Sequence, residues 1–285
     1  EKYGFPFRFR SAREEVLQRK YGLPEHRREA YELQEKLLSA IRANDKETTS
    51  EIKKEYYEKY PDQLEGVEVL FGLKNFLQNQ KTFSNEKIGD REIKLERLKD
   101  LTEYQFLFTH YLIQNTEDKE FLRKFWDTAE EISKKTDTIK ELNNLRLGLL
   151  SQTSVYKILE SLGEQPQLSH PTEDAFHAID LWFQSDVALQ VKLGKGVTEP
   201  LLLESDNIVF PAVQTNSEQD TKYYNAKYFQ DSMRFRSKIE EYGKMIGKDL
   251  QGYVMIIPYS KIDFITGEPS QDLVDFFREK LQNLK

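Results

Sequence analysis

The spacing of the apolar residues changes near residue 140, and this change constrains the fold more than any other feature. Before it, apolar residues recur every three or four positions, as in amphipathic helices. The clearest stripes span residues 30–41, 67–77, 95–112 and 121–132. Asp45 is placed to cap a helix that would end near Pro61. The sequence therefore predicts an all-helical region over residues 1–142.

The second half combines helical stripes with short strand-like segments, joined by turns. The segments AIDLWF and VALQVKL are typical of neighbouring strands, and the apolar run GYVMIIP of a buried strand. A helix is expected before them, ending at Gly163, a residue type common just after helices. The expected strands are residues 178–183, 187–193, 208–215 and 252–258, and further helices are expected at 223–245 and 270–284. Residues 143–285 are thus predicted to form an α/β domain with the order helix, three strands, helix, strand, helix.

Composition narrows the functional classes. The net charge of −7 argues against a generic, charge-driven nucleic-acid binder, although a local basic face or a bound metal ion can offset it. Cysteine is absent, which excludes disulfides and thiolate metal sites and fits a cytoplasmic location. No apolar run approaches the ~20 residues that span a bilayer, so no membrane association is expected. The chain begins with Glu1 rather than Met, so it is also expected to be a fragment or a processed product.

Three polar residues stand out in the first two expected strands. Side chains alternate along a strand, so Gln190 and Lys192 share one face of the second strand while its apolar residues share the other. Asp180 lies opposite the apolar face of the preceding strand. If both apolar faces contact one core, the three polar side chains emerge on the same side.

Phosphodiester hydrolysis requires such a set. A carboxylate holds Mg²⁺, which prefers oxygen ligands, and the metal activates a bound water. A lysine nearby orients that water or stabilises developing negative charge. We assign Asp180 to the metal, Gln190 to the metal or the water, and Lys192 to the nucleophile or the transition state. The backbone carbonyl of Val191 is a further candidate metal ligand.

Asp180, nine intervening residues and then Gln190-Val191-Lys192 resemble the signature of the PD-(D/E)xK, or restriction-endonuclease-like, nuclease superfamily. The QxK form looks most like its Mrr-type branch, as does the helix ending at residues 159–163. The resemblance covers residues 149–258 and implies an αβββαβα domain with a mixed sheet. It also implies an endonuclease that uses Mg²⁺ or Mn²⁺ and cuts DNA rather than RNA. The helical half matches no family that we can name.

Two departures from the family's pattern concern the metal. The family's leading helix glutamate falls near Gln152, so that carboxylate is replaced by an amide. Glu160, two helical turns later, is an imperfect substitute. Glu173 or Asp174 is the alternative source of a carboxylate. The loop before Asp180 also lacks the glycines usual in the family.

Several alternatives remain open at this stage. In one alternative, the domain is an inactive nuclease-fold module that binds nucleic acid or a protein. In another, the chain is a helical scaffold unrelated to nucleases. Asp180 and Lys192 are then ordinary polar strand residues, and His177 is a structural histidine. The basic residues around Lys238 are then a solvated helix face. The helical half is expected to position the substrate or a partner, with a homodimer or another protein both open.

Overall fold

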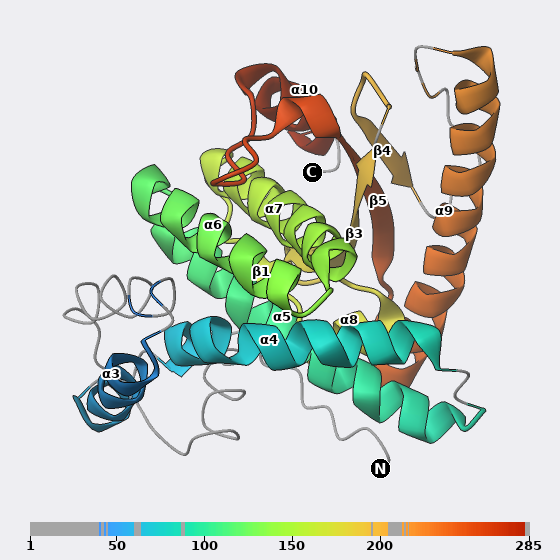
Figure 1. Ribbon diagram of the computed structural model, residues 1–285. Coiled ribbons are helices and arrows are strands. Elements are labelled where there is room, and N and C mark those ends of the chain that lie inside the picture. Colours follow the sequence, from blue (N-terminus) through green and yellow to red (C-terminus); the bar gives the residue numbers. More distant parts are fainter. Residues whose placement is uncertain are drawn as a thin grey trace. The chain divides into compact units, whose positions relative to one another are not determined.

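The computed structural model describes residues 40, 43, 45–59, 64–86, 89–194, 196–204, 213, 215 and 217–282. The helix expected at 30–41 lies almost wholly outside these residues. The chain divides into two compact units: one comprises Glu1–Gln114 with Asp118–Leu142, and the other Asn115–Glu117 with Asn143–Lys285. Figure 1 shows the described part of the first unit as helices and the sheet as part of the second.

Helices account for the described secondary structure of the first unit, as predicted. They are α3 (Lys46–Lys59), α4 (Leu64–Asn85), α5 (Arg91–Asn115), α6 (Lys119–Lys135) and the start of α7 (Ile139–Ser161). The Asp45 carboxylate accepts a hydrogen bond from the backbone N–H of Thr48 at 3.1 Å and caps α3, as expected. Asp118 caps α6 in the same way through Phe121.

Aromatic side chains fill the core of this helical unit. Phe76 stacks on Tyr104 with ring centroids 4.4 Å apart, and Phe108 stacks on Trp126 at 5.6 Å. Phe125 meets Phe108 edge-on at 5.3 Å. The Tyr104 hydroxyl donates to the carbonyl of Val69, so its polar end is satisfied. Burial of large rings is therefore the main source of stability in the described core.

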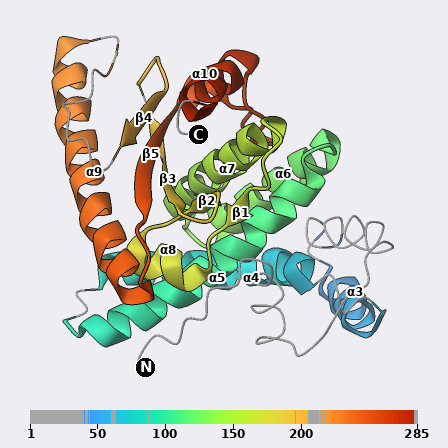
Figure 2. The same ribbon diagram turned by 180° about the vertical axis from the view of Figure 1, so that it is seen from behind.

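A five-stranded mixed sheet lies at the centre of the second unit. Its order is β1-β2-β3-β5-β4, with β3 and β5 parallel and the other neighbours antiparallel. The strands are β1 (Gln167–Leu168), β2 (Leu181–Phe183), β3 (Val187–Gly194), β4 (Leu201–Glu204) and β5 (Gln251–Pro258). Figures 1 and 2 show α9 (Glu218–Ile246) on one side of this sheet and α7 and α10 (Gln271–Gln282) on the other.

The central hairpin and the buried strand agree with the sequence pattern. Leu181 pairs with Leu189 across β2 and β3, and residues 184–186 form the turn between them. The whole of β3 pairs with β5, which is buried from Gly252 to Pro258 because helices cover both faces. Gly163 follows α7 with φ of +77°, the left-handed conformation expected at this position.

Two expectations about the strands were wrong. Residues 178–180 precede β2 instead of belonging to it, and a short helix α8 (Pro171–His177) occupies the preceding segment. Pro171 at the first helical position and the reciprocal bonds of His170 and Glu173 favour that helix. The strand β4 was missed, and it pairs with β5 at the edge of the sheet instead of with β3. Most of the segment 208–215, where a strand was expected, lies outside the described residues.

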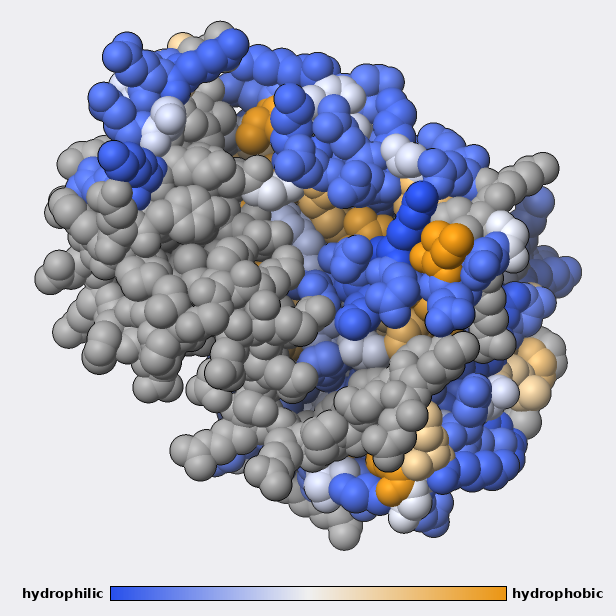
Figure 3. All heavy atoms as spheres, turned by 90° about the horizontal axis from the view of Figure 1, so that it is seen from below, coloured by the Kyte–Doolittle hydropathy of each residue, from blue (hydrophilic) through white to orange (hydrophobic). Residues whose placement is uncertain are grey.

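Few large hydrophobic side chains are exposed in the described part of the chain. Figure 3 shows one face, where described residues are mostly hydrophilic and hydrophobic ones form small separate patches. The large exposed ones are Ile93, Ile139, Tyr223, Met233, Met245 and Tyr259. Within the described ranges, none of the helices has the length and apolarity needed to cross a membrane.

Candidate functional site

Asp180 is held between α7 and the hairpin. Its backbone N–H donates to the carbonyl of Leu189 at 2.9 Å, so it continues the β2–β3 ladder by one residue. One carboxylate oxygen accepts from Nε2 of Gln152 at 2.6 Å, and the other accepts from the backbone N–H of Val191 at 2.7 Å. One bond from α7 and one from β3 therefore fix the position of this carboxylate.

Gln190 and Lys192 lie on β3 beside Asp180. The β2–β3 register places Asp180 opposite Gln190, which is buried and donates from Nε2 to the carbonyl of Ala178 at 3.3 Å. Lys192 is half-buried, and its positive charge lowers the pKa of Asp180 and of Asp174. The hairpin thus brings the three residues of the sequence motif together.

Asp174 adds a second carboxylate to this group. It projects from α8 and is half-buried. Burial raises its pKa well above the usual value, repulsion from Asp180 raises it further, and the charges of Lys192 and Lys238 act in the opposite direction. Burial is also the main cause of the raised pKa of Asp180. We call Asp174, Asp180, Lys192 and Lys238 the Asp–Lys cluster.

Lys238 enters the cluster from α9, and the sequence analysis missed it by treating it as part of a solvated face. Burial lowers its pKa, while the charges of Asp174 and Asp180 raise it. A signal was present in the sequence. Lys238 stands three residues after Phe235 and four before Tyr242, both buried, so it lies beside the buried stripe of α9.

Glu173 has a different environment from its neighbour Asp174. It is fully buried and accepts hydrogen bonds from the Trp182 indole at 3.0 Å, the Tyr242 hydroxyl at 2.9 Å and the His170 backbone N–H at 2.9 Å. Burial raises its pKa to about 7, and these three hydrogen bonds oppose that rise. Glu173 therefore joins α8, β2 and α9, and its oxygens are occupied by protein donors.

The other candidate residues fall in different surroundings. Glu160 is exposed and pairs with Lys157 at 3.3 Å, and Asp180 receives its α7 contact from Gln152 instead. Val191 contacts Asp180 through its N–H, not through the carbonyl expected to bind metal. The His177 ring lies 4.5 Å from that of Tyr242, a packing contact, and burial lowers its pKa.

Asp174 and Asp180 offer carboxylate oxygens, the kind of ligand that Mg²⁺ prefers. Over the described residues, no three His, Cys, Asp or Glu side chains form a group that could hold a metal ion. Mg²⁺, however, commonly binds one or two carboxylates and keeps several waters. Asp174 and Asp180 repel each other, as shown by the raised pKa of Asp174, and a cation between them would relieve that repulsion.

Comparison of the chain with protein-family models, with curated proteins and with solved structures gave no match. The geometry of the Asp–Lys cluster and the fold around it therefore carry the functional argument.

Proposed function

We propose that the second unit is a metal-dependent nuclease of the PD-(D/E)xK type, with DNA as its expected substrate. The observation that carries this proposal is the Asp–Lys cluster, in which two carboxylates and two lysines meet beside the β2–β3 hairpin. The order α7, β2, β3, β4, α9, β5, α10 supports it, because the family's αβββαβα core has this order once β1 and α8 are set aside. The helical unit is proposed to position the substrate or a partner.

In the proposed reaction, the acidic and the basic residues of the Asp–Lys cluster have different roles. Asp174 and Asp180 would hold Mg²⁺ or Mn²⁺, which when bound polarises a phosphate oxygen and lowers the pKa of water. Lys192 stabilises negative charge that develops on the phosphate, or orients the attacking water. Lys238 adds a second positive charge on the α9 side. Gln152 holds Asp180 in place, and Gln190 lies on β3 opposite Asp180.

One observation favours a second candidate, an inactive nuclease fold that binds nucleic acid or protein. Where the family has a glutamate, Gln152 donates a hydrogen bond to Asp180 instead of offering a carboxylate. Both Asp180 oxygens already accept hydrogen bonds. Each oxygen has two lone pairs, so metal binding is compatible with these bonds but competes with the Gln152 donor.

Cleavage of plasmid and single-stranded substrates with Mg²⁺ or Mn²⁺ tests the first candidate, together with metal titration by calorimetry. Asp180→Asn and Asp174→Asn should each weaken metal binding, because each removes one of the two carboxylates. Lys192→Ala should leave metal binding largely intact and slow cleavage by about 10²–10³, the effect of losing one electrostatic stabiliser. Lys244→Ala, an exposed lysine on α9, is the matched control and should change neither quantity.

Gln152→Glu and Gln190→Glu separate the two candidates. Each supplies a carboxylate beside Asp180, so each should tighten Mg²⁺ binding if the cluster is a metal site. Wild-type protein that neither cuts nor binds metal, together with Gln152→Glu and Gln190→Glu variants that also bind none, would establish the inactive module.

A further inference from the structure

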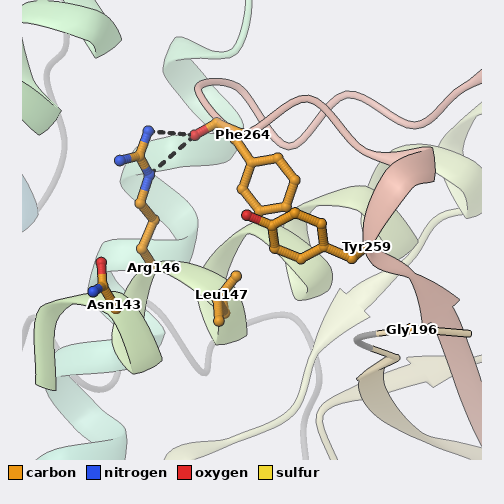
Figure 4. Close-up of a pocket in the computed structure, with 6 residues that line it drawn as sticks. All are labelled: Asn143, Arg146, Leu147, Gly196, Tyr259 and Phe264. Atoms are coloured by element: carbon orange, nitrogen blue, oxygen red, sulfur yellow. Dashed lines mark hydrogen bonds between the residues drawn. The ribbon is translucent and has the colours of Figure 1, made fainter. Parts of the chain in front are cut away.

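A cavity of about 550 Å³ opens at the carboxyl end of β3 and β5, within the second unit. Figure 4 shows its lining, in which the rings of Tyr259 and Phe264 face each other. Their centroids lie 3.9 Å apart. The other lining residues are Asn143, Arg146, Leu147 and Gly196. The cavity thus offers an aromatic surface edged by an amide and a guanidinium.

Two hydrogen bonds fix one wall of this cavity. Arg146 of α7 donates from Nε and Nη2 to the carbonyl of Phe264, at 3.0 and 2.6 Å, which ties the loop after β5 to the helix (Figure 4). Tyr259 is 41% exposed, so its ring is both positioned and accessible. A flat aromatic ring held in this way is suited to stacking against another flat ring.

A row of tyrosines on α9 lies near one residue of this cavity, Gly196. A side chain at Gly196, which lines the cavity, would stand 3.7 Å from the ring of Tyr224. Tyr224 stacks on Tyr228 at 5.6 Å and meets Tyr223 edge-on at 5.2 Å. Gly196 has φ of +80°, so a residue without Cβ is favoured there. Gly196 therefore borders both the cavity, on the α7 side of the sheet, and the tyrosine row, on the α9 side.

A positive charge lies beside two rings of this row. The Lys227 ammonium lies 5.9 Å from the Tyr224 ring centroid and 5.5 Å from that of Tyr228. Tyr223 is 61% exposed, the highest value among the large hydrophobic residues that the structure describes. The exposed Tyr223 ring and the half-buried Tyr224 ring, with the Lys227 ammonium close to Tyr224, match the chemistry of nucleic acid, whose bases stack on rings and whose phosphates attract ammonium groups.

We propose that Tyr259 with its cavity and the α9 row of Tyr223 and Tyr224 bind the unpaired bases of a single-stranded nucleic acid. This inference rests on the proposed function and gives it a substrate class. Gly194 ends β3 two residues after Lys192. A nucleic-acid strand bound at the cavity therefore lies at the carboxyl end of β3, the β-strand that carries Gln190 and Lys192. Bases inside a duplex are already stacked on each other and leave no face for these rings.

The net charge predicts how this binding responds to salt. Binding driven mainly by phosphate contacts weakens steeply with salt, in proportion to the number of phosphates neutralised. Here the chain carries a net charge of −7, and Lys227 is the cation placed on the row. Stacking therefore contributes most of the affinity, and the salt dependence is shallow.

Fluorescence anisotropy of labelled oligothymidylate and oligouridylate, with duplex DNA as competitor, tests the proposal on the full chain. EDTA is present so that no cleavage occurs. Tyr259→Ala and Tyr223→Ala should each weaken binding by about 5-fold to 100-fold, as expected for one base–aromatic stack. Tyr259→Phe should restore affinity because the ring remains. Met245→Ala, another exposed α9 side chain, is the control and should have no effect.

A separate pair of lysines tests the role of charge. Lys227→Ala should weaken binding, while Lys244→Ala, also exposed on α9, should not. Lack of affinity for both oligonucleotides overturns the inference, as does an unchanged affinity in both tyrosine-to-alanine variants or tighter binding of the duplex. The two oligonucleotides show whether DNA or RNA is preferred.

The failure of this inference is distinguishable from failure of the proposed function. Oligonucleotide binding is measured in EDTA and cleavage with Mg²⁺, so the two readouts are independent. Binding without any metal-dependent cleavage would leave the inference standing and remove the nuclease proposal. Cleavage of duplex DNA without affinity for single strands would leave the nuclease proposal standing and remove this inference.

Discussion

The described parts of the two units differ in the carboxylates whose pKa is raised. In the helical unit, the carboxylates with a shifted pKa are Asp45 and Asp137, and hydrogen bonds at the surface lower both values. In the second unit, surface hydrogen bonds likewise lower the pKa of Glu240 and Asp272, whereas burial raises the pKa of Glu173, Asp174 and Asp180. A surface partner adds little to stability, whereas a buried carboxylate disfavours its own charge until a proton or a cation compensates it.

This difference fits a structural role for the helical unit and a functional site in the second unit. The described core of the helical unit is built from rings such as Phe108 and Trp126, and its ion pairs, such as Lys81 with Asp137, are largely exposed. The second unit retains buried polar groups that its hydrophobic core alone does not require. Groups with perturbed pKa values gather at functional sites because chemistry needs them there.

The largest expected effect concerns the helical core. Phe108→Ala should lower the free energy of unfolding by about 3–5 kcal/mol, because the fully buried ring contacts three other aromatic residues. Urea denaturation followed by circular dichroism measures the change. Ile93→Ala, at an exposed position, should stay within about 0.5 kcal/mol. Loss of metal binding in folded Phe108→Ala protein would contradict the separation of scaffold and site.

The next largest change in stability is expected at Glu173, which we treat as a structural residue. Glu173→Gln should lower the free energy of unfolding by about 1 kcal/mol, because the amide nitrogen replaces the oxygen that accepts from the Tyr242 hydroxyl. The same denaturation measures it, with the exposed Glu241→Gln as control. A stability equal to that of wild type would show that Glu173 is not the link between α8, β2 and α9.

A pH dependence distinguishes His177 from an exposed histidine. Its folded pKa is lowered, mainly by burial, so the unfolded chain binds a proton first as the pH falls below about 6.5. Its contribution to stability is therefore complete above that pH and is lost as the pH falls. The stability difference between wild type and His177→Phe should shift against wild type from pH 7 to pH 5. A constant difference between their denaturation midpoints would contradict the buried, neutral ring.

The smallest effect concerns the backbone next to Asp180. Ala178 has φ of +56°, a left-handed conformation that costs a residue with Cβ roughly 1 kcal/mol. Ala178→Gly should therefore raise the free energy of unfolding by about 0.5 kcal/mol, after the entropy of the unfolded glycine is subtracted. Ala175→Gly, inside α8, is the matched control and should lower it. Destabilisation by both changes would show that Ala178 is not strained.

Much of the fold follows from patterns that are local in the sequence. Periodicity identified the helices through α7, and the apolar run from Gly252 to Pro258 identified β5. Local patterns failed at Leu201–Glu204, because a strand at a sheet edge needs only the hydrogen bonds of its neighbour and can be short. They also failed at Ala178, where the cap of α8 overrides a strand-like composition.

The sequence by itself determined the alternation that puts Gln190 and Lys192 on one face of a strand, and it singled out Asp180. Only the tertiary structure decided which further residues join them. Asp174 and Glu173 are adjacent on a short helix, yet one faces the charged cluster and the other a buried set of donors. Lys238 lies 46 positions beyond Lys192 in the sequence and comes near it through the packing of α9. Charge interactions depend on distance and on burial in space, and neither quantity is encoded in the spacing of residues along the chain.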